Sequence, residues 1–525
     1  MTPPSAAPRE APQHSSAQES IFYRRIAPLL GVLSLVAACI LWSLKKQLAG
    51  DELFTSVEIA DPSLVHLMRA AEHLGGAGMP LFYLTMWPWA HLFGQSPLAL
   101  RLASCVDVCA AFLILLAVLR RRFTARAAFL GAAFAFFASL LVVDQNVEAR
   151  GYGLYLLLAV LAVAWILRVA EIPKPRPRDL VLLALTQAGL VLGHILGLFY
   201  AGLLLLALIV IDRGQRRFRL RVYLAAMAGW LALIPWIPAI LASMAVGKPH
   251  TWIAMPTVAD LAIGLSGWLF GGIYFPPLRN HPLGLVAGWA CAMVCILVLV
   301  AASAIRLRSA EPSRRSTDIV ALALLSAPIL FFVVSHLASP VYVGRYLIPT
   351  AIGIAILAAA WFEHSATYSA PRAAAVLACA LLLLPVASAL LARPESLPVA
   401  RIDQLAAGRP VVCDWLQDFL AMVRYNQDPA PPQYPLDWNA ALRGPNSGTG
   451  AYKLLANYRD QGYLASDIRD TSAIFAQPSF LVLDDSQTDW FRLEIENNPR
   501  FSWKILAPID AKRSLIEVTR KPATP

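Results

Sequence analysis

The feature that most constrains this chain is a series of long apolar segments that recur between residues 26 and 391. Several of them reach the roughly 20 apolar residues that an α-helix needs to cross the hydrocarbon core of a bilayer. Hydrophobic residues make up 58% of the 525 residues and charged ones only 15%, whereas a soluble domain would carry about 25% charged residues. The sequence therefore predicts a polytopic α-helical membrane protein.

Basic clusters between the apolar segments predict the topology, because Lys and Arg are enriched in cytoplasmic loops. Such clusters stand at 120–122, 213–221 and 306–315, and Lys45-Lys46 is the exception to the resulting pattern. We expect a protein of the plasma (inner) membrane with its N-terminus in the cytoplasm and its C-terminus outside. The expected spans, about eleven, lie near 26–44, 98–119, 127–143, 152–169, 180–194, 196–211, 222–242, 283–305, 318–335, 346–362 and 373–391.

The first outer loop, residues 51–96, is predicted to hold two amphipathic helices, around 57–74 and 80–93. The second carries several Trp, Tyr and Phe rings, which settle at the headgroup level of a membrane. We therefore expect this loop to lie in the membrane interface, with both helices parallel to the bilayer plane.

Composition divides the chain into three parts. Residues 1–20 are rich in Pro, Ala, Ser and Gln and are typical of a disordered tail, here cytoplasmic. Residues 21–391 form the predicted transmembrane domain. From residue 392 to residue 525 the sequence is more polar, with short apolar runs and a helical pattern over 415–425. These features predict a small extracytoplasmic α/β domain.

The net charge of +11 does not indicate nucleic-acid binding, because most basic residues belong to the topological clusters and none form a patch interleaved with aromatic residues.

The cysteine residues do not indicate a metal site. Six of the seven Cys fall in apolar spans, and only Cys413 lies in the predicted soluble domain. No disulfide framework or metal-binding spacing follows from that distribution.

Charged side chains recur at the ends of the spans, all on the predicted outer face. Each has an ordinary interpretation: solvated loop carboxylates, a local ion pair, an interfacial arginine, or a histidine that satisfies a backbone carbonyl. Together, however, they suit a lipid phosphate, since guanidinium groups bind phosphate oxygens bidentately and a carboxylate can accept a proton from an attacking hydroxyl. The residues are Asp51, Glu52, Glu148, Arg150, His194 and Arg345.

These motifs match a known family in their order and spacing, over roughly residues 20–390. The chain resembles the family 39-type membrane glycosyltransferases, which have the C-type glycosyltransferase fold and include protein O-mannosyltransferases and lipid A aminoarabinose transferases. The family usually has a basic residue and two prolines before its Leu-Tyr-Tyr motif, where this chain has Gly78-Met79-Pro80, so another arginine would take over the role of that basic residue. The matching segments are Asp51-Glu52, Pro80-Leu81-Phe82-Tyr83, Phe93-Gly94-Gln95-Ser96, Ala99-Leu100-Arg101-Leu102, Glu148-Ala149-Arg150-Gly151-Tyr152, His194 and Arg345-Tyr346-Leu347-Ile348-Pro349.

The resemblance implies an inverting glycosyltransferase that moves a sugar from a polyprenyl-phosphate donor to a hydroxyl of a lipid, glycan or protein acceptor. It implies Asp51 as the general base, with Glu52 and Glu148 in the catalytic group. These two glutamates and His194 would orient the acceptor or hold a divalent cation, and the family leaves metal dependence open. The resemblance further places the donor phosphate at Arg345, Arg150 and Tyr346, and orients the acceptor with His194, Tyr83 and Tyr152.

Two other classes of protein are compatible with a polytopic chain. A transporter or flippase of a lipid-linked or sugar substrate would place its polar groups near the bilayer midplane, often in two related halves. This sequence has them at the span ends and shows no two-fold repeat. A non-catalytic scaffold that presents the C-terminal domain would leave the pattern of carboxylates and arginines unexplained.

The predicted topology can be tested with fusions. A reporter that is active only outside the cytoplasm should be active after Pro525 and silent near Arg217, because the arginine clusters are retained inside. The reverse pattern would place Asp51 in the cytoplasm and contradict the predicted orientation.

Overall fold

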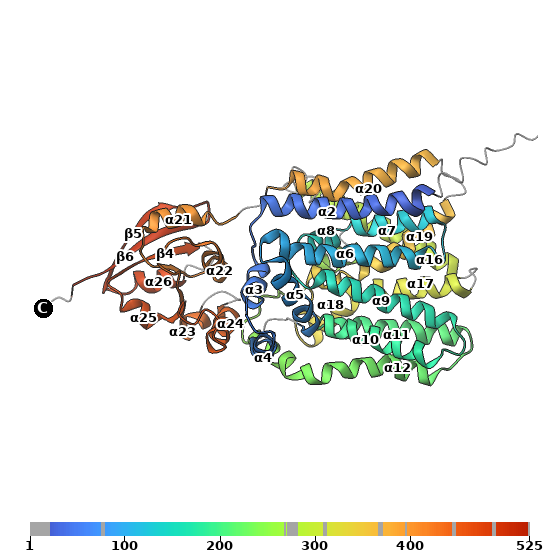
Figure 1. Cartoon of the computed structure of the whole chain (residues 1–525), viewed down its shortest axis with the longest axis horizontal. Helices are drawn as coiled ribbons and strands as arrows, with labels where there is room; N and C mark the ends of the chain where they lie inside the picture. The colour runs from blue at the N-terminus through green and yellow to red at the C-terminus, as the bar shows by residue number, and fades with distance from the viewer. Residues whose placement is uncertain are drawn as a thin grey trace, which may run out of the picture.

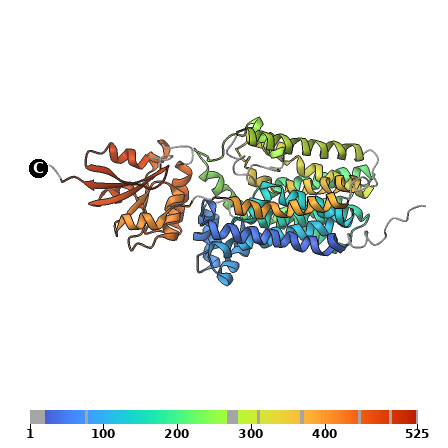
Figure 2. The same ribbon diagram turned by 90° about the horizontal axis from the view of Figure 1, so that it is seen from above.

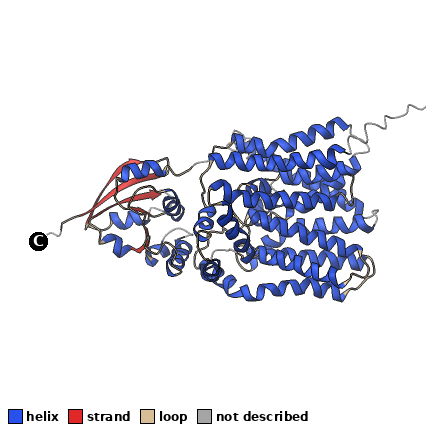
Figure 3. Cartoon of the chain, viewed as in Figure 1, coloured by secondary structure: helices blue, strands red, loops and turns tan. Residues whose placement is uncertain are grey.

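A bundle of long helices and a smaller domain that contains strands make up the molecule (Figure 1, Figure 3). The computed structural model describes residues 21–74, 79–266, 269, 282–307, 312–365, 371–393, 396–443, 448–485 and 490–522. Gly78 and most of the segment between residues 266 and 282 lie outside these ranges. The elements of the first half are η1 (Phe22–Ile26), α2 (Ala27–Lys45), α3 (Asp51–Glu58), α4 (Leu64–Leu74), α5 (Pro80–Phe93), α6 (Pro97–Leu119), α7 (Ala125–Phe137), α8 (Leu140–Asn146), α9 (Tyr152–Glu171), α10 (Pro177–Gly193), α11 (Gly197–Gly214), α12 (Leu220–Trp230), η2 (Leu231–Trp236) and α13 (Ile237–Val246).

The bundle continues with α14 (Val258–Leu265), α16 (Pro282–Leu307), α17 (Pro312–Leu325), α18 (Ala327–Leu337), η4 (Gly344–Leu347), α19 (Thr350–Ser365) and α20 (Pro371–Leu391). Within the described residues, eight helices are long and apolar enough to cross a membrane, and α7 and α19 are shorter apolar helices. The predicted polytopic membrane fold is confirmed. The count of eleven spans stays a prediction, with α10 as the helix nearest to the expected span at 180–194.

Two expected helices are divided in the structure. The predicted span 127–143 is broken between α7 and α8, where Ser139 has an extended backbone and bridges to Leu269. The predicted interfacial helix over 57–74 is instead two helices, α3 and α4. Between them the Asp61 carboxylate accepts a hydrogen bond from the Ser63 N–H at 2.9 Å, and Pro62, which lacks an N–H, favours a break.

The arginine clusters gather at the end of the bundle where α2 begins. Arg120 donates to the Tyr23 carbonyl at 2.6 Å, and Arg219 donates to the carbonyls of Val169 and Ile172 at the end of α9. Lys45, the exception to the charge rule, lies at the opposite end. Its ammonium donates to carbonyls at the C-terminal end of α20, where the helix macrodipole favours a cation.

Small residues let the helices of the bundle approach closely, as is common in membrane proteins. A Cβ added at Gly131 of α7 would lie 2.5 Å from the Ala359 nitrogen of α19. Similarly, a Cβ at Gly153 of α9 would lie 2.7 Å from the Ser104 carbonyl oxygen of α6. These contacts hold α7 against α19 and α6 against α9, and the start of α9, at Tyr152, carries part of the candidate site described below.

The C-terminal part of the chain contains a four-stranded mixed sheet in the order β1-β4-β6-β5. Strands β1 and β4 are parallel, and β4-β6 and β6-β5 are antiparallel. The predicted small strand-containing domain is therefore confirmed. Its elements are α21 (Val399–Ala406), β1 (Val411–Cys413), α22 (Leu416–Tyr425), β2 (Tyr434–Leu436), α23 (Trp438–Arg443), α24 (Gly448–Asp460), β3 (Ile468–Asp470), α25 (Thr471–Phe475), β4 (Ser479–Asp485), α26 (Trp490–Glu496), β5 (Phe501–Pro508) and β6 (Arg513–Arg520).

The C-terminal domain lies at the end of the bundle that carries α3, α4 and α5, and this end is called the site end below. Figure 1 shows these short helices at the end of the bundle nearest to the domain, and Figure 2 shows the domain at the same end of the bundle. Several hydrogen bonds join the two parts, among them the Tyr425 hydroxyl with the Leu48 N–H at 2.8 Å and Arg424 with the Gln95 carbonyl at 2.6 Å.

The packing of α7 on α19 yields a stability prediction. Gly131→Ala should destabilise the protein by about 1–3 kcal/mol, because the added methyl meets backbone atoms that cannot move aside. Gly202→Ala on α11 is the matched control, since nothing lies within 4 Å of its added Cβ and both variants gain the same helix propensity. Thermal unfolding of the purified protein in detergent measures the difference, and equal midpoints would contradict the close packing.

Candidate functional site

Helix α3 organises the site end. It follows Gly50, whose φ of +56° and ψ of −129° are accessible to glycine and strained for other residues. Asp51 and Glu52 stand in the first turn, where the partial positive charge of a helix N-terminus stabilises carboxylates. Asp51, Thr55 and Glu58 are spaced by four and three residues and therefore lie on one face of the helix.

Asp51 forms an ion pair with Arg345 from the other half of the chain. An Asp51 carboxylate oxygen lies 2.8 Å from a terminal guanidinium nitrogen of Arg345, and the two side chains are 33% and 27% exposed. The Arg345 Nε donates to the Tyr152 hydroxyl at 2.8 Å. The guanidinium also lies 5.2 to 5.8 Å from the ring centres of Tyr152, Trp252 and Tyr346. Arg345 is thus held in a defined orientation, with part of its surface open.

Arg150 supports the same helix face. Its guanidinium donates to the Asp51 carbonyl and to the Thr55 hydroxyl, both at 3.1 Å. Burial by itself lowers the pKa of Arg150, but the carboxylates of Asp51 and Glu58 outweigh it and raise this pKa. Arg150 is therefore charged at any physiological pH and contributes a fixed positive charge beside Asp51.

Glu52, the neighbour of Asp51, has a different environment. Its carboxylate is buried and accepts hydrogen bonds from Arg101 through both oxygens at 2.7 Å, from the Ala149 N–H at 2.9 Å and from the Ala49 N–H at 3.2 Å. Arg101 is fully buried and also donates to the carbonyls of Lys46 and Gln47. Glu52 therefore forms a buried ion pair with Arg101 beneath the site, called the clamp below, and both of its carboxylate oxygens already accept hydrogen bonds.

Glu148 is the second carboxylate with access to the site. It lies just before Arg150, is partly buried, and its side chain has no hydrogen-bond partner within the described part of the chain. Burial raises the pKa of Glu148, the nearby Glu52 carboxylate raises it further, and Lys46 and Arg345 oppose this rise. Burial and the Glu52 carboxylate thus favour the protonated form of Glu148 more than water would.

His194 lies in an aromatic cluster beside Arg345. It follows α10, is buried, and its Nδ1 accepts a hydrogen bond from the Leu196 N–H at 3.1 Å. Its ring stacks on Tyr155, with 4.5 Å between centres, and also lies 5.1 Å from Tyr346 and 5.6 Å from Tyr152. The imidazole is therefore enclosed by tyrosine rings, and one of its nitrogens is already occupied by a backbone N–H.

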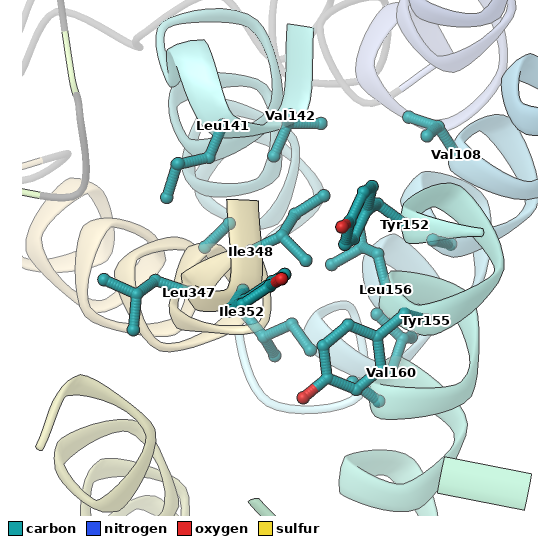
Figure 4. Close-up of a cluster of buried hydrophobic side chains, with 14 of the residues drawn as sticks. Val108, Leu141, Val142, Tyr152, Tyr155, Leu156, Val160, Leu347, Ile348 and Ile352 are labelled. Carbon is teal, nitrogen blue, oxygen red and sulfur yellow. The ribbon is translucent and has the colours of Figure 1, made fainter. Parts of the chain in front are cut away.

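An apolar floor supports these rings (Figure 4). Side chains from four parts of the chain meet there, namely α6, α8, α9 and the stretch from η4 to α19, and Tyr152 and Tyr155 stand among them. The floor explains why the short η4 helix, which carries Arg345 and Tyr346, occupies a fixed position against the start of α9. The labelled residues are Val108, Leu141, Val142, Tyr152, Tyr155, Leu156, Val160, Leu347, Ile348 and Ile352.

Tyr83 lies at the other end of α3, away from Arg345. Its hydroxyl donates to the Glu58 carboxylate at 3.0 Å, and the other Glu58 oxygen accepts from Tyr458 of the C-terminal domain at 2.6 Å. Burial raises the pKa of Glu58, although the Tyr458 hydrogen bond opposes it. Tyr83 therefore holds α3 in position, and the structure shows no contact of its ring with the Asp51–Arg345 pair.

Of the residues singled out in the sequence, the structure brings Asp51, Glu148, Arg150, Arg345, Tyr152, Tyr346 and His194 into one region. Sequence reasoning gave no role to Arg101, Glu58, Trp252 or Tyr458. An arginine and a glutamate within largely apolar stretches signal a buried pair, which could have identified Arg101. Nothing local in the sequence indicates that Trp252 or Tyr458 approaches the site. Among the described residues, no three His, Cys, Asp or Glu side chains are grouped as metal ligands.

Comparisons with known proteins show the fold. No family model matches the sequence, and no curated protein matches it either. Among solved structures, ArnT from Cupriavidus metallidurans bound to undecaprenyl phosphate superposes with a TM-score of 0.55 at 14% identity, over 93% of this chain and 97% of that one. ArnT from the same organism in the apo state gives a TM-score of 0.51 at 15% identity, over 96% and 98%. The C-type glycosyltransferase fold predicted from the sequence is thereby confirmed.

The two acids of α3 should respond differently to loss of charge. Glu52→Gln leaves the buried Arg101 charge without its partner and should destabilise the protein by about 3–5 kcal/mol. Asp51→Asn affects a partly exposed pair and should cost less than about 1 kcal/mol. Thermal unfolding of both variants in detergent checks this difference, and an Asp51→Asn variant that is the less stable of the two would overturn the assignment of Glu52 to the clamp.

Proposed function

We propose that this protein is an inverting glycosyltransferase that moves a sugar from a polyprenyl-phosphate donor to an acceptor hydroxyl, on the outer face of the plasma (inner) membrane. The observation that carries the proposal is the ion pair of Asp51 and Arg345 at the site end of the bundle. A proton acceptor and a cation stand there side by side at the boundary of an apolar helix bundle, where a lipid-linked phosphate would enter.

Two further observations support a polyprenyl-phosphate donor. The fold is that of ArnT, whose structure contains undecaprenyl phosphate, and the motifs of this chain resemble those of the family 39-type enzymes. The charged groups of the candidate site also match the chemistry of a phosphate, because a guanidinium binds phosphate oxygens through paired hydrogen bonds. The lipid chain would lie along the apolar spans with the phosphate at their end.

In the proposed donor complex Arg345 binds the phosphate. Two of its nitrogens are occupied, Nε by Tyr152 and a terminal nitrogen by Asp51, so its remaining N–H groups are available to phosphate oxygens. Arg150 adds positive charge from behind Asp51. Tyr346 and Tyr152 flank the guanidinium and restrict its orientation.

The transfer itself needs a base and charge stabilisation. Asp51 accepts the proton of the acceptor hydroxyl while the hydroxyl oxygen attacks the anomeric carbon from the side opposite the phosphate, which inverts the configuration. The bond between the anomeric carbon and the phosphate oxygen breaks, and its electron pair remains on the polyprenyl phosphate. Arg345 stabilises the charge that develops on this leaving group, so the leaving group needs no proton.

The other predicted residues take supporting roles. Glu148 faces the same region with free carboxylate oxygens and orients the acceptor, whereas Glu52 positions α3 through Arg101. His194 packs behind the tyrosines, and Tyr83 holds the far end of α3. The described residues group no three His, Cys, Asp or Glu side chains as metal ligands, so every step of the proposed transfer is assigned to this chain's own residues.

The arrangement argues against a transporter with a midplane site. The charged residues of the candidate site lie between helices or in their first turns, at Asp51, Glu148, Arg150 and in η4, close to the C-terminal domain. Transporters typically coordinate their substrate near the bilayer midplane at broken helices. The position of these charges at helix ends therefore fits a glycosyltransferase better than a transporter with a midplane site.

A paired experiment on the whole chain in detergent tests the proposal. Asp51→Asn should lower sugar transfer roughly 10²–10⁴-fold, the usual contribution of a general base, and should still bind undecaprenyl phosphate. Arg345→Ala should weaken binding of undecaprenyl phosphate by about 10- to 150-fold, because it removes charge-assisted hydrogen bonds worth about 1.5–3 kcal/mol. Arg345→Lys should restore binding only in part, since an ammonium lacks the planar fork.

Transfer is measured with a lipid extract that contains polyprenyl-phosphate sugars, and binding with purified undecaprenyl phosphate. Normal transfer by Asp51→Asn would show that Asp51 is only a partner for Arg345. Unchanged binding by Arg345→Ala would place the phosphate elsewhere. Gly202→Ala, remote from the site, serves as the control for handling in detergent.

A further inference from the structure

One helix of the C-terminal domain contacts the segments on both sides of the candidate site. Helix α24 (Gly448–Asp460) carries Thr449, Lys453 and Asn457 at intervals of four residues, so the three side chains lie on one face. Tyr458 follows directly and is fully buried. In Figure 1, α24 lies beside α3 and α4, at the boundary between the domain and the bundle.

On one side, α24 contacts α3, the helix that carries Asp51, and the end of α4. The Tyr458 hydroxyl donates to the Glu58 carboxylate in the last turn of α3 at 2.6 Å, and the rings of Tyr458 and Phe54 stack with 6.3 Å between centres. Asn457 donates to the His73 carbonyl at the end of α4 at 2.9 Å. Since Glu58 and Asp51 lie on the same face of α3, the Tyr458 contact restrains the helix face that carries Asp51.

On the other side, α24 holds the segment of residues 247–257, called the Trp252 segment here. The Lys453 ammonium donates to the carbonyls of Ala245 at 2.8 Å and Lys248 at 2.5 Å, and the Thr449 hydroxyl accepts from the His250 N–H at 3.2 Å. Lys453 thereby caps the C-terminal end of α13, where a cation is favoured.

Trp252 makes this second set of contacts relevant to the site. Its ring centre lies 5.2 Å from the Arg345 guanidinium, yet the residue is 55% exposed. An exposed indole over a cation that also pairs with Asp51 forms a wall of the site, and cation–π contact helps to orient Arg345. Ile253 of this segment packs against the hydrophobic core, and α24 adds the side-chain hydrogen bonds that join the segment to the C-terminal domain.

We propose that α24 is a positioning element of the site, and that Tyr458 and Lys453 set the distance between Asp51 on α3 and the Trp252 wall over Arg345. Neither residue touches the reacting groups: Tyr458 acts through Glu58, and Lys453 acts through the backbone of the Trp252 segment. The consequence for catalysis rests on the proposed function, while the positioning of the two segments does not.

Four variants of the full chain test the proposal. Tyr458→Phe removes the hydroxyl on Glu58. Tyr463→Phe is its matched control, because it removes a hydroxyl that donates at 2.6 Å to Asp61, in the turn after α3, across the same interface. Lys453→Met removes the ammonium and keeps the apolar stem, and Lys453→Arg keeps donors for the two carbonyls and should behave as the wild type.

The first measurement is hydrogen–deuterium exchange and is independent of any ligand. Lys453→Met should accelerate exchange in residues 247–257 roughly tenfold, as expected for loss of a charge-assisted contact to a local unit, and leave strand β4 unchanged. Tyr458→Phe should do the same in α3, and Tyr463→Phe should not. The proposal would be overturned if exchange stayed at the wild-type rate both in residues 247–257 of Lys453→Met and in α3 of Tyr458→Phe.

The second measurement separates positioning from general destabilisation. Lys453→Met should weaken binding of undecaprenyl phosphate about three- to tenfold at an unchanged maximal transfer rate, and Tyr458→Phe should lower that rate with binding retained. A parallel loss of binding and rate in both variants would mean that α24 only stabilises the fold and would overturn the proposal. Absence of undecaprenyl phosphate binding in the wild type would instead contradict the proposed function, and exchange would still decide the role of α24.

Discussion

The buried ion pair between Arg101 and Glu52 is the interaction on which the site end depends. A guanidinium with no exposed surface is costly to bury unless every donor has a partner. Here the pair also satisfies the carbonyls of Lys46 and Gln47 and the Ala149 N–H. It therefore joins the end of α2, the start of α3, the first turns of α6 and the segment before α9, and it fixes the backbone from which Asp51, Glu148 and Arg150 project.

The three acids of α3 have different partners, set by helix face for Glu52 and by position along the helix for Asp51 and Glu58. Asp51 faces Arg345 and solvent, Glu52 faces the buried Arg101, and Glu58 faces two tyrosine hydroxyls. Only the first of the three retains partial exposure together with an ion pair that a phosphate can share. A short helix with one open and two buried carboxylates can present a proton acceptor rigidly, because its own position is determined by the other two.

The bundle and the C-terminal domain contribute different physical properties to this region. The bundle contributes apolar helices and the aromatic cluster around His194, which packs against Tyr346 beside Arg345. The C-terminal domain contributes polar contacts to loops that the bundle alone leaves exposed, through α24 and through Tyr463 on Asp61. In the proposed reaction the reacting atoms meet at this junction of an apolar and a polar layer.

The sequence by itself determined that the chain forms a polytopic helical bundle with a strand-containing C-terminal part, and at which end of the bundle the arginine clusters gather. Apolar runs and arginine clusters act locally, so their positions along the chain suffice to place them. The sequence also indicated Asp51, Arg150 and Arg345 as neighbours, through their order at the span ends and the family they resemble. The orientation in the membrane, the domain boundaries and the number of spans remain predictions.

Only the tertiary structure decided how the charges are paired. Asp51 and Glu52 are adjacent in sequence, but successive helix positions point in different directions, so one faces the site and the other a buried arginine. The contacts of Trp252 with Arg345 and of Tyr458 with Glu58 join residues far apart in the chain. Their formation depends on how helices and domain pack, and no local pattern in the sequence encodes that packing.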